Sequence, residues 1–250
     1  MRERRVKYRP LNTSLQTGST MTTDPRMQKL RLGFTWCYLL KCSDCHLLID
    51  TSYPHYFPQF QKAIAGFVID MAEIKYLLLT HHHDDHAGFA AELIKNTGCR
   101  VIAHRNAVEP LRHGKSEETM KPVNRRVKFV FSLFALFHRQ FTFPPVILGE
   151  NDIVLTGDDF DLLRTIELNG RILYTPGHSR DSISVVLSDG SAFVGDVAMN
   201  FLRLIGIKHR PIFVEDINMV YESWQRLIEQ GAKVIYPAHG KPFSARELVR

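Results

Sequence analysis

Histidine and aspartate side chains crowd into one short stretch of the chain, directly after an apolar run that is typical of a buried strand. The stretch reads His81-His82-His83-Asp84-Asp85-His86. Side chains two residues apart at a strand end point to the same side, so His81 and His83 can bind one metal ion while His82 faces elsewhere. Asp85 and His86 fall on the following turn, where a carboxylate and an imidazole suit a second divalent ion.

Three further candidate ligands each follow an apolar run much later in the chain. They are His178 after Pro-Gly, Asp196 after Val-Gly, and His239 before Gly240. A lone histidine after glycine is usually part of a capped turn. Three strand ends that share one chemistry instead indicate loops that converge on a single edge of the sheets.

The elements that must position these residues alternate between strands and helices. A hairpin is expected from residues 34–40 and 47–49, and Asp50 follows its second strand. Further strands are expected at residues 76–79, 100–103, 152–155, 161–168, 171–174, 182–187, 191–194 and 233–236. Helices are expected at residues 60–71, 89–95 with Gly98 closing it, 106–112, and 217–228 between Asp216 and Gly231. Two similar halves of this kind favour sheets packed on each other with helices outside.

A single domain is expected over residues 30–250, with a phenylalanine-rich insertion at about residues 114–148. Residues 129–143 hold six of the 16 phenylalanines. This run is too short to span a bilayer, which takes about 20 apolar residues. Packing in the core or as a lid over the site is the favoured interpretation, a homodimer contact is second, and an interfacial membrane anchor is third.

Residues 1–29 are expected to form a disordered or loosely attached basic tail. The formal net charge is +6, and residues 1–30 hold seven basic against two acidic side chains. The rest of the chain is therefore close to neutral, and a nucleic-acid partner is not expected. No apolar stretch of a secretory signal follows the basic start, and Met21 is an alternative start to Met1.

Four cysteines without a secretory signal favour a reduced, cytoplasmic compartment. Cys42 and Cys45 have the C-x-x-C spacing that can hold zinc or perform redox chemistry. Ser43-Asp44 falls where the hairpin turn belongs, and no second ligand pair of similar spacing is present. The favoured interpretation is a turn with two incidental thiols.

The chain carries the histidine stretch first, then a Gly-His pair, a Gly-Asp pair and a final His-Gly pair. In this order, these motifs resemble the signature of the metallo-β-lactamase fold superfamily over roughly residues 30–243. The resemblance implies an α+β fold, a four-layer αββα sandwich in which two mixed sheets pack face to face. It implies one metal ion bound by His81, His83 and His178, and a second bound by Asp85, His86 and His239. It further implies that Asp196 bridges both ions and that Asp50 supports the ligands.

The function that the resemblance implies is that of a dinuclear metal-dependent hydrolase, with zinc expected and manganese or iron as alternatives. Two ions about 3.5–4 Å apart lower the pKa of a shared water toward 7. The resulting metal-bridged hydroxide is expected to attack the carbonyl carbon of an ester, lactone or thioester. Asp85 is the candidate catalytic residue, because it can also orient this nucleophile. The expected partner is a small-molecule substrate with an acyl chain.

Within the superfamily the chain looks like the lactonase and glyoxalase II-like general hydrolase branch. Asp196 stands where true β-lactamases of this fold commonly depart from aspartate, and His83 stands where the diiron redox branch carries glutamate. One departure is Met199, because the lactonases carry a tyrosine three residues after the bridging aspartate. A phosphodiesterase or nuclease is the alternative, supported by Lys208-His209-Arg210. A non-catalytic metal-binding scaffold is a further alternative, although such proteins usually lose ligands.

Overall fold

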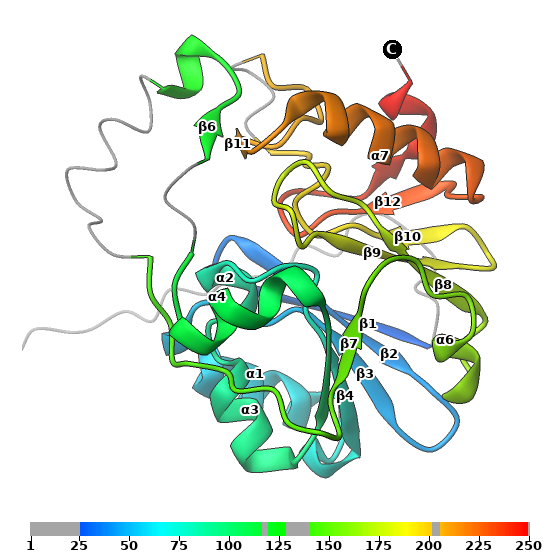
Figure 1. Ribbon diagram of the computed structural model, residues 1–250. Coiled ribbons are helices and arrows are strands. Elements are labelled where there is room, and N and C mark those ends of the chain that lie inside the picture. Colours follow the sequence, from blue (N-terminus) through cyan, green and yellow to red (C-terminus); the bar gives the residue numbers. More distant parts are fainter. Residues whose placement is uncertain (1–25, 117–119, 129–140, 202–205, 250) are drawn as a thin grey trace, which may run out of the picture.

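The computed structural model of the protein describes residues 26–116, 120–128, 141–201 and 206–249. Two β-sheets pack face to face, and helices cover their outer sides (Figure 1). Residues 1–25 of the expected tail and residues 129–140 of the phenylalanine-rich segment lie outside the described residues.

The first sheet has six strands in the order β1-β2-β3-β4-β5-β7. They are β1 Met27–Leu32, β2 Thr35–Lys41, β3 His46–Ile49, β4 Ile74–Leu78, β5 Arg100–His104 and β7 Ile153–Leu155. The first three strands run antiparallel to one another, and the rest pair in parallel, so the sheet is mixed. β1 begins at Met27, which places ordered structure slightly before the expected domain boundary at residue 30.

The second sheet has five strands in the order β13-β12-β10-β9-β8. They are β8 Gly170–Tyr174, β9 Ile183–Leu187, β10 Ser191–Phe193, β12 Val234–Tyr236 and β13 Phe243–Ser244. Only β10 and β12 pair in parallel. A separate two-stranded sheet joins β6 Lys121–Pro122 of the insertion to β11 Phe213–Val214, and the two lie side by side in Figure 1.

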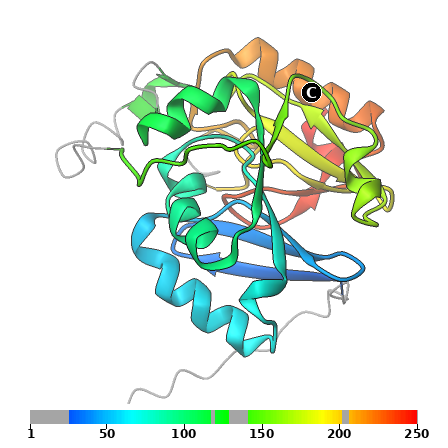
Figure 2. The ribbon, with the colours of Figure 1, turned by 60° about the horizontal axis from the view of Figure 1, so that its bottom comes forward.

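Helices lie on the outer face of each sheet (Figure 2). The first sheet is covered by α1 Phe57–Gly66, α3 Ala90–Thr97 and α4 Val108–His113, and the second by α7 Ile217–Glu229. Shorter helices are α2 Asp84–Ala87, α6 Leu162–Thr165, η1 Pro54–Tyr56, η2 Met71–Glu73, η3 Arg105–Ala107 and η5 Ala245–Leu248. Gly98 ends α3 with φ 65°, and the Asp216 side chain accepts from the backbone N–H of Asn218 at the start of α7, both as expected.

Three apolar layers hold this arrangement together. Leu47 and Phe193 belong to the layer between the sheets. Phe60 and its neighbours fill the space between the first sheet and its helices, and Val220 and Trp224 anchor α7 to the second sheet. Burial of such side chains contributes roughly 1.5–3 kcal/mol each. The layer order of helix, sheet, sheet, helix confirms the expected α+β sandwich.

Two expected elements differ in the structure. Residues 161–168 were expected to form a strand, but they contain the short helix α6. The Asp159 carboxylate accepts from the backbone N–H groups of Asp161 and Leu162 and so starts a helical turn. The helix expected to run to residue 71 ends at Gly66, and Val68 adopts the left-handed backbone, with φ 59°, that turns the chain away.

Backbone hydrogen bonds join the two ends of the insertion. Lys115 bridges Thr142, and the backbone N–H of Phe143 donates to the carbonyl of Gly114. Phe143 is buried in the core of the first sheet, whereas Phe141 is 57% exposed. Within the described parts of the chain, no helix has the length and apolar character needed to cross a membrane.

Candidate metal centre

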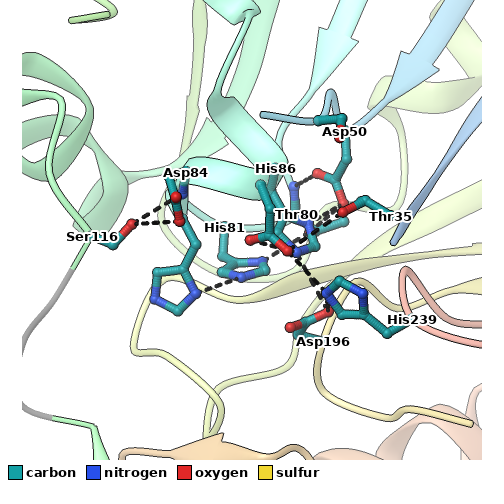
Figure 3. Close-up of polar contacts among 12 residues, drawn as sticks. Thr35, Asp50, Thr80, His81, Asp84, His86, Ser116, Asp196 and His239 are labelled. Atoms are coloured by element: carbon teal, nitrogen blue, oxygen red, sulfur yellow. Dashed lines mark hydrogen bonds and ion pairs between the residues drawn. The ribbon is translucent and has the colours of Figure 1, made fainter. Parts of the chain in front are cut away.

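All seven expected ligands meet at one edge of the sandwich, where loops leave the strands of both sheets. Asp50 follows β3 and His81 follows β4 in the first sheet. His178, Asp196 and His239 follow β8, β10 and β12 in the second sheet. Because the two sheets pack face to face, the side chain of His81 from the first sheet points toward those of Asp196 and His239 from the second (Figure 3).

The first set consists of His81, His83 and His178, all buried. The Nε2 atom of His81 lies 2.9 Å from Nδ1 of His83 and 3.2 Å from Nε2 of His178. Nδ1 of His83 lies 3.1 Å from Nε2 of His178. A hydrogen bond needs one donor and one acceptor, so three ring nitrogens that all face one another are poorly satisfied among themselves. A shared cation satisfies all three lone pairs at once.

The second set consists of Asp85, His86 and His239. Oδ2 of Asp85 lies 3.0 Å from Nε2 of His239, and Oδ1 lies 3.6 Å from Nε2 of His86. Asp85 and His86 are both on α2, which starts directly after His83. One carboxylate oxygen and two imidazole nitrogens form a donor set suited to a divalent transition metal.

Asp196 faces both sets at once. Its Oδ1 atom lies 3.4 Å from Nε2 of His86 and 3.4 Å from Nε2 of His239, while its Oδ2 atom lies 3.7 Å from Nε2 of His178. Among the described residues, Oδ1 of Asp196 and Nε2 of His86 are buried without a hydrogen-bond partner. Buried polar atoms of this kind normally have a partner, so their convergence fits a bound metal ion.

Asp50 belongs to neither ligand set and supports the centre through hydrogen bonds. Its carboxylate accepts from the backbone N–H of Thr80 at 2.7 Å, from the Thr80 hydroxyl at 2.7 Å and from Nδ1 of His86 at 2.9 Å. The last contact fixes the tautomer of His86 and turns the Nε2 lone pair toward Asp85 and Asp196.

Backbone carbonyls orient two other histidines in the same way. Nδ1 of His178 donates to the carbonyl of Phe213 at 2.9 Å, and Nδ1 of His239 donates to the carbonyl of Phe34 at 3.0 Å. In both cases Nε2 is left with its lone pair toward the centre. The geometry therefore directs Nε2 of both rings at the centre, where it can bind a metal ion once any second proton on the ring has left.

The charges in the site favour a cation. Burial, followed by the neighbouring imidazoles, lowers the pKa of His81 and of His83 well below the usual range, so both rings are neutral. Burial opposes ionisation of Asp196, but the facing His239 and His86 outweigh it and hold the pKa of Asp196 well below its usual value. Burial lowers the pKa of His239 while Asp196 raises it, to about 10. A metal ion bound here displaces that proton.

Several residues of the site were not expected from the sequence. Thr80 joins Asp50 to His81, and its place just before the histidine stretch was an available signal. The Thr35 hydroxyl donates to Oδ2 of Asp85 at 3.4 Å. His82 contributes to neither set, and its Nδ1 lies 3.0 Å from the buried carboxylate of Asp181, for which the sequence offered no signal.

The insertion is also tied to the centre. The Ser116 hydroxyl accepts from the backbone N–H of Asp84 at 3.0 Å and donates to Oδ1 of Asp84 at 3.3 Å (Figure 3). Asp84 directly precedes Asp85. Burial, and then Asp85, raises the pKa of the Asp84 carboxyl to about 6. The first end of the insertion therefore starts beside the second ligand set.

Aromatic residues lie close to the second set. The carbonyl of Phe34 accepts from His239, while its side chain is 66% exposed. The rings of Phe34 and Phe201 are 6.3 Å apart between centroids. Burial, followed by the nearby Asp85 carboxylate, raises the pKa of the half-buried Tyr53 phenol. Exposed aromatic rings beside a polar centre provide contact area for an apolar part of a ligand.

Comparison with known proteins agrees with this fold. Residues 30–239 match the family model of the metallo-beta-lactamase superfamily. The chain therefore belongs to the metallo-beta-lactamase superfamily, which includes metal-dependent hydrolases. This confirms the family resemblance that the motifs indicated.

Relatives of the chain include two kinds of protein. A metallo-beta-lactamase fold-containing protein of Sulfurisphaera tokodaii is 30% identical over 72% of this chain and 65% of its own length. A hydroxyacylglutathione hydrolase of Rhodopseudomonas palustris is 28% identical over 69% of this chain and 50% of its own. The chain thus spans only half to two thirds of the length of these relatives.

Solved structures share the fold. A metallo-beta-lactamase of Cronobacter sakazakii with a HARLDQ motif superposes with a TM-score of 0.60 at 24% identity, covering 86% of this chain and 76% of that chain. The subclass B3 enzyme BJP-1 of Bradyrhizobium japonicum gives a TM-score of 0.59 at 22% identity, covering 86% and 75%. At these identities the likeness concerns the fold alone.

Proposed function

We propose that this protein is a dinuclear metal-dependent hydrolase that attacks the carbonyl carbon of an ester, lactone or thioester. The observation that carries the proposal is the position of Asp196, whose two carboxylate oxygens face two separate donor sets. We propose His81, His83 and His178 as ligands of one ion, Asp85, His86 and His239 as ligands of the other, and Asp196 as the bridge. Zinc is the proposed metal, because it accepts histidine and carboxylate ligands together.

The donor atoms fit this assignment, and each protein group has a definable task. Two bound ions supply an activated water at neutral pH and polarise the carbonyl oxygen of the substrate. Asp85 is the proposed catalytic residue, because its carboxylate is ionised, partly buried beside His86 and His239, and able to accept a hydrogen bond from the attacking water. The Thr35 hydroxyl donates to Asp85 and restricts its rotation.

A carbonyl substrate with an acyl or aromatic group is supported by the surface beside the centre. The exposed ring of Phe34 and the neighbouring ring of Phe201 provide an apolar border next to His239. Similarity to a hydroxyacylglutathione hydrolase also supports a substrate with an acyl group. The phenylalanines within residues 129–140, which were expected to pack in the core or as a lid over the site, lie outside the described residues.

The alternative of a phosphodiesterase or nuclease loses part of its support in the structure. Of the basic run at residues 208–210, the His209 ring is buried and lies 3.2 Å from the carboxylate of Glu247. The Arg210 guanidinium donates to the carbonyls of Gly206 and Ile207. Two of these three basic side chains therefore make contacts within the fold, whereas contact with nucleic acid needs cations presented on the surface.

The test is a hydrolysis panel on metal-replete protein with an acyl lactone, a glutathione thioester, an aryl ester and an aryl phosphodiester. We expect activity on a carbonyl substrate, and a loss of at least about 100-fold in Asp85→Ala, because removing one catalytic group typically costs that much. Asp161→Ala, at an exposed carboxylate on the surface, is the matched control and should retain full activity.

Three results would contradict the proposal. Hydrolysis of the phosphodiester alone would favour the alternative enzyme class. Full activity in a correctly folded Asp85→Ala or His83→Ala protein would remove the proposed site. Stoichiometric metal binding without hydrolysis of any substrate would favour the non-catalytic scaffold, and circular dichroism of each variant shows whether it has folded.

A further inference from the structure

A second group of reactive side chains lies far from the metal centre, in the turn that joins β2 to β3. Lys41 at the end of β2 pairs with His46 at the start of β3. The next pair along this ladder is Cys42 and Cys45, and the backbone N–H of Cys42 donates to the carbonyl of Cys45 at 2.9 Å. Side chains of residues that lie opposite each other in a ladder project from the same face, so the two thiols lie on the same side of the hairpin. The turn thus holds both cysteines face to face.

This pairing matches what a disulfide requires. Residues directly opposite each other in an antiparallel ladder have Cα atoms about 4.5–5.5 Å apart. Disulfides span Cα distances of about 4.4–6.8 Å. Because Ser43 and Asp44 form a short turn between the two residues, a bond between the sulfurs requires no large movement of the backbone.

The two thiols differ in their access to solvent. Cys42 is buried, and burial followed by the neighbouring Cys45 raises the pKa of its thiol to about 12. Cys45 is only partly buried. An oxidant from solvent therefore reacts with Cys45 first, while the neighbouring Cys42 thiol stays protonated.

We propose that Cys42 and Cys45 form a redox-active dithiol, which closes to an intrachain disulfide by exchange with a low-molecular-weight disulfide such as oxidised glutathione. Cys45, as its thiolate, attacks one sulfur of the reagent and releases one thiolate, which leaves a mixed disulfide on Cys45. Cys42 then loses its proton to solvent and attacks the Cys45 sulfur, which releases the second thiolate. Two protein thiols are oxidised, and one reagent disulfide is reduced to two thiols.

The dithiol is separate from the metal centre. Thr35 at the start of β2 contacts Asp85, whereas Cys42 follows the other end of the same strand. Seven residues of strand separate these two ends, which corresponds to roughly 20 Å. Oxidation is therefore expected to leave the metal ligands and their spacing unchanged.

The chain contains its own internal controls. Cys37 is fully buried, and its thiol donates to the carbonyl of Thr51 at 3.0 Å. Cys99 is also buried. Cys37 lies opposite Leu30 in the ladder between β1 and β2. Trypsin cleaves after Lys41 and Lys62, so one peptide contains Cys42 and Cys45 together and neither of the other cysteines.

The experiment treats the full-length, metal-loaded protein with oxidised glutathione, blocks free thiols with iodoacetamide and analyses tryptic peptides by mass spectrometry. We expect the peptide of residues 42–62 to lose the mass of two hydrogens and to take up no iodoacetamide, and to recover both thiols after dithiothreitol. The peptides that contain Cys37 and Cys99 should show no such change.

Single substitutions test the proposed order of attack. Cys42→Ser should keep glutathione attached to Cys45, because no second thiol is present to displace it. Cys45→Ser should take up little glutathione, because the remaining Cys42 is buried. A wild-type protein that retains glutathione on Cys45, or in which both thiols stay open to iodoacetamide, would overturn the proposal. Metal content and hydrolysis are measured in parallel, so the outcome is independent of the proposed enzyme activity.

Discussion

Asp50 illustrates, at the scale of a single residue, how a side chain outside the proposed ligand set can control the metal centre. It accepts three hydrogen bonds, one of which fixes the ring of His86. It also has a left-handed backbone with φ 58°, which asparagine and aspartate tolerate better than most residues. Asp50→Asn therefore removes the charge while keeping the backbone conformation.

We expect Asp50→Asn to weaken metal binding about 10–100-fold, because loss of a hydrogen-bonded partner of a ligand typically has this effect. Competition with a coloured chelator measures the affinity directly. Asp161→Asn, on the surface, is the control and should bind as tightly as the wild type. Equal affinities in all three proteins would show that Asp50 does not support the centre.

Phe34 makes the proposed substrate preference testable at the same scale. Its backbone orients His239 and its ring is exposed, so Phe34→Ala removes the ring and leaves the carbonyl in place. We expect kcat/KM for a long-chain acyl ester to fall about tenfold, equivalent to about 1.4 kcal/mol of lost apolar contact. An acetyl ester should be unaffected, and Phe160→Ala, another exposed ring, should change neither substrate. An equal loss for both esters would contradict a role in acyl recognition.

The candidate ligands could be selected from the sequence because their signal is local. Each follows an apolar run, and His81, His83, Asp85 and His86 lie within six consecutive residues. The structure brings them together with the later residues, while the assignment of each to an ion stays a prediction. The contact between His82 and Asp181 could not be predicted from the sequence, because it joins residues 99 positions apart that share no sequence motif.

At the scale of elements, the start of α7 holds the loop that carries His178. The backbone N–H groups of Glu215 and Asp216 donate to the carbonyl of Gly177, and the Ser223 hydroxyl donates to the carbonyl of Pro176. Gly177 itself has φ 130°, and a Cβ atom there would lie 2.4 Å from the backbone nitrogen of Val220. Helix and loop are therefore packed too closely for any side chain at this position.

Gly177→Ala is expected to destabilise the protein by about 2–5 kcal/mol, through backbone strain together with overpacking against α7. Gly98→Ala is the matched control, because Gly98 has φ 65° with nothing within 4 Å of the added atom. That change should cost only about 1–2 kcal/mol. Urea unfolding measures both, and similar losses in the two variants would show that the close contact with α7 is unimportant.

The elements that the sequence predicted correctly have regularly spaced apolar residues or a clear capping residue. α7 shows both, since its apolar residues share one face and Asp216 caps its start. α6 was missed because four residues make a single turn, too short to show a helical period. The pairing of β6 with β11 could not be predicted either, because each strand has two residues and they lie far apart in the chain.

At the scale of the whole molecule, the proposed ligands come from both sheets. His81, His83, Asp85 and His86 follow β4, whereas His178, Asp196 and His239 follow strands of the second sheet. A bound ion therefore links the two halves of the sandwich at the edge where they meet. Because the unfolded chain does not hold these residues together, metal binding adds directly to the free energy of unfolding.

We expect each bound zinc ion to stabilise the protein by about 2.7 kcal/mol relative to the chelator-treated protein when free zinc exceeds its dissociation constant about 100-fold. For a chain of this size, that corresponds to a rise in melting temperature of roughly 5–10 °C. Differential scanning calorimetry measures the shift. His178→Ala removes a ligand of the second sheet and should reduce the shift, because the ion then has fewer contacts with that half. If the wild type melted at the same temperature with and without zinc, the proposed cross-link between the two sheets would be wrong.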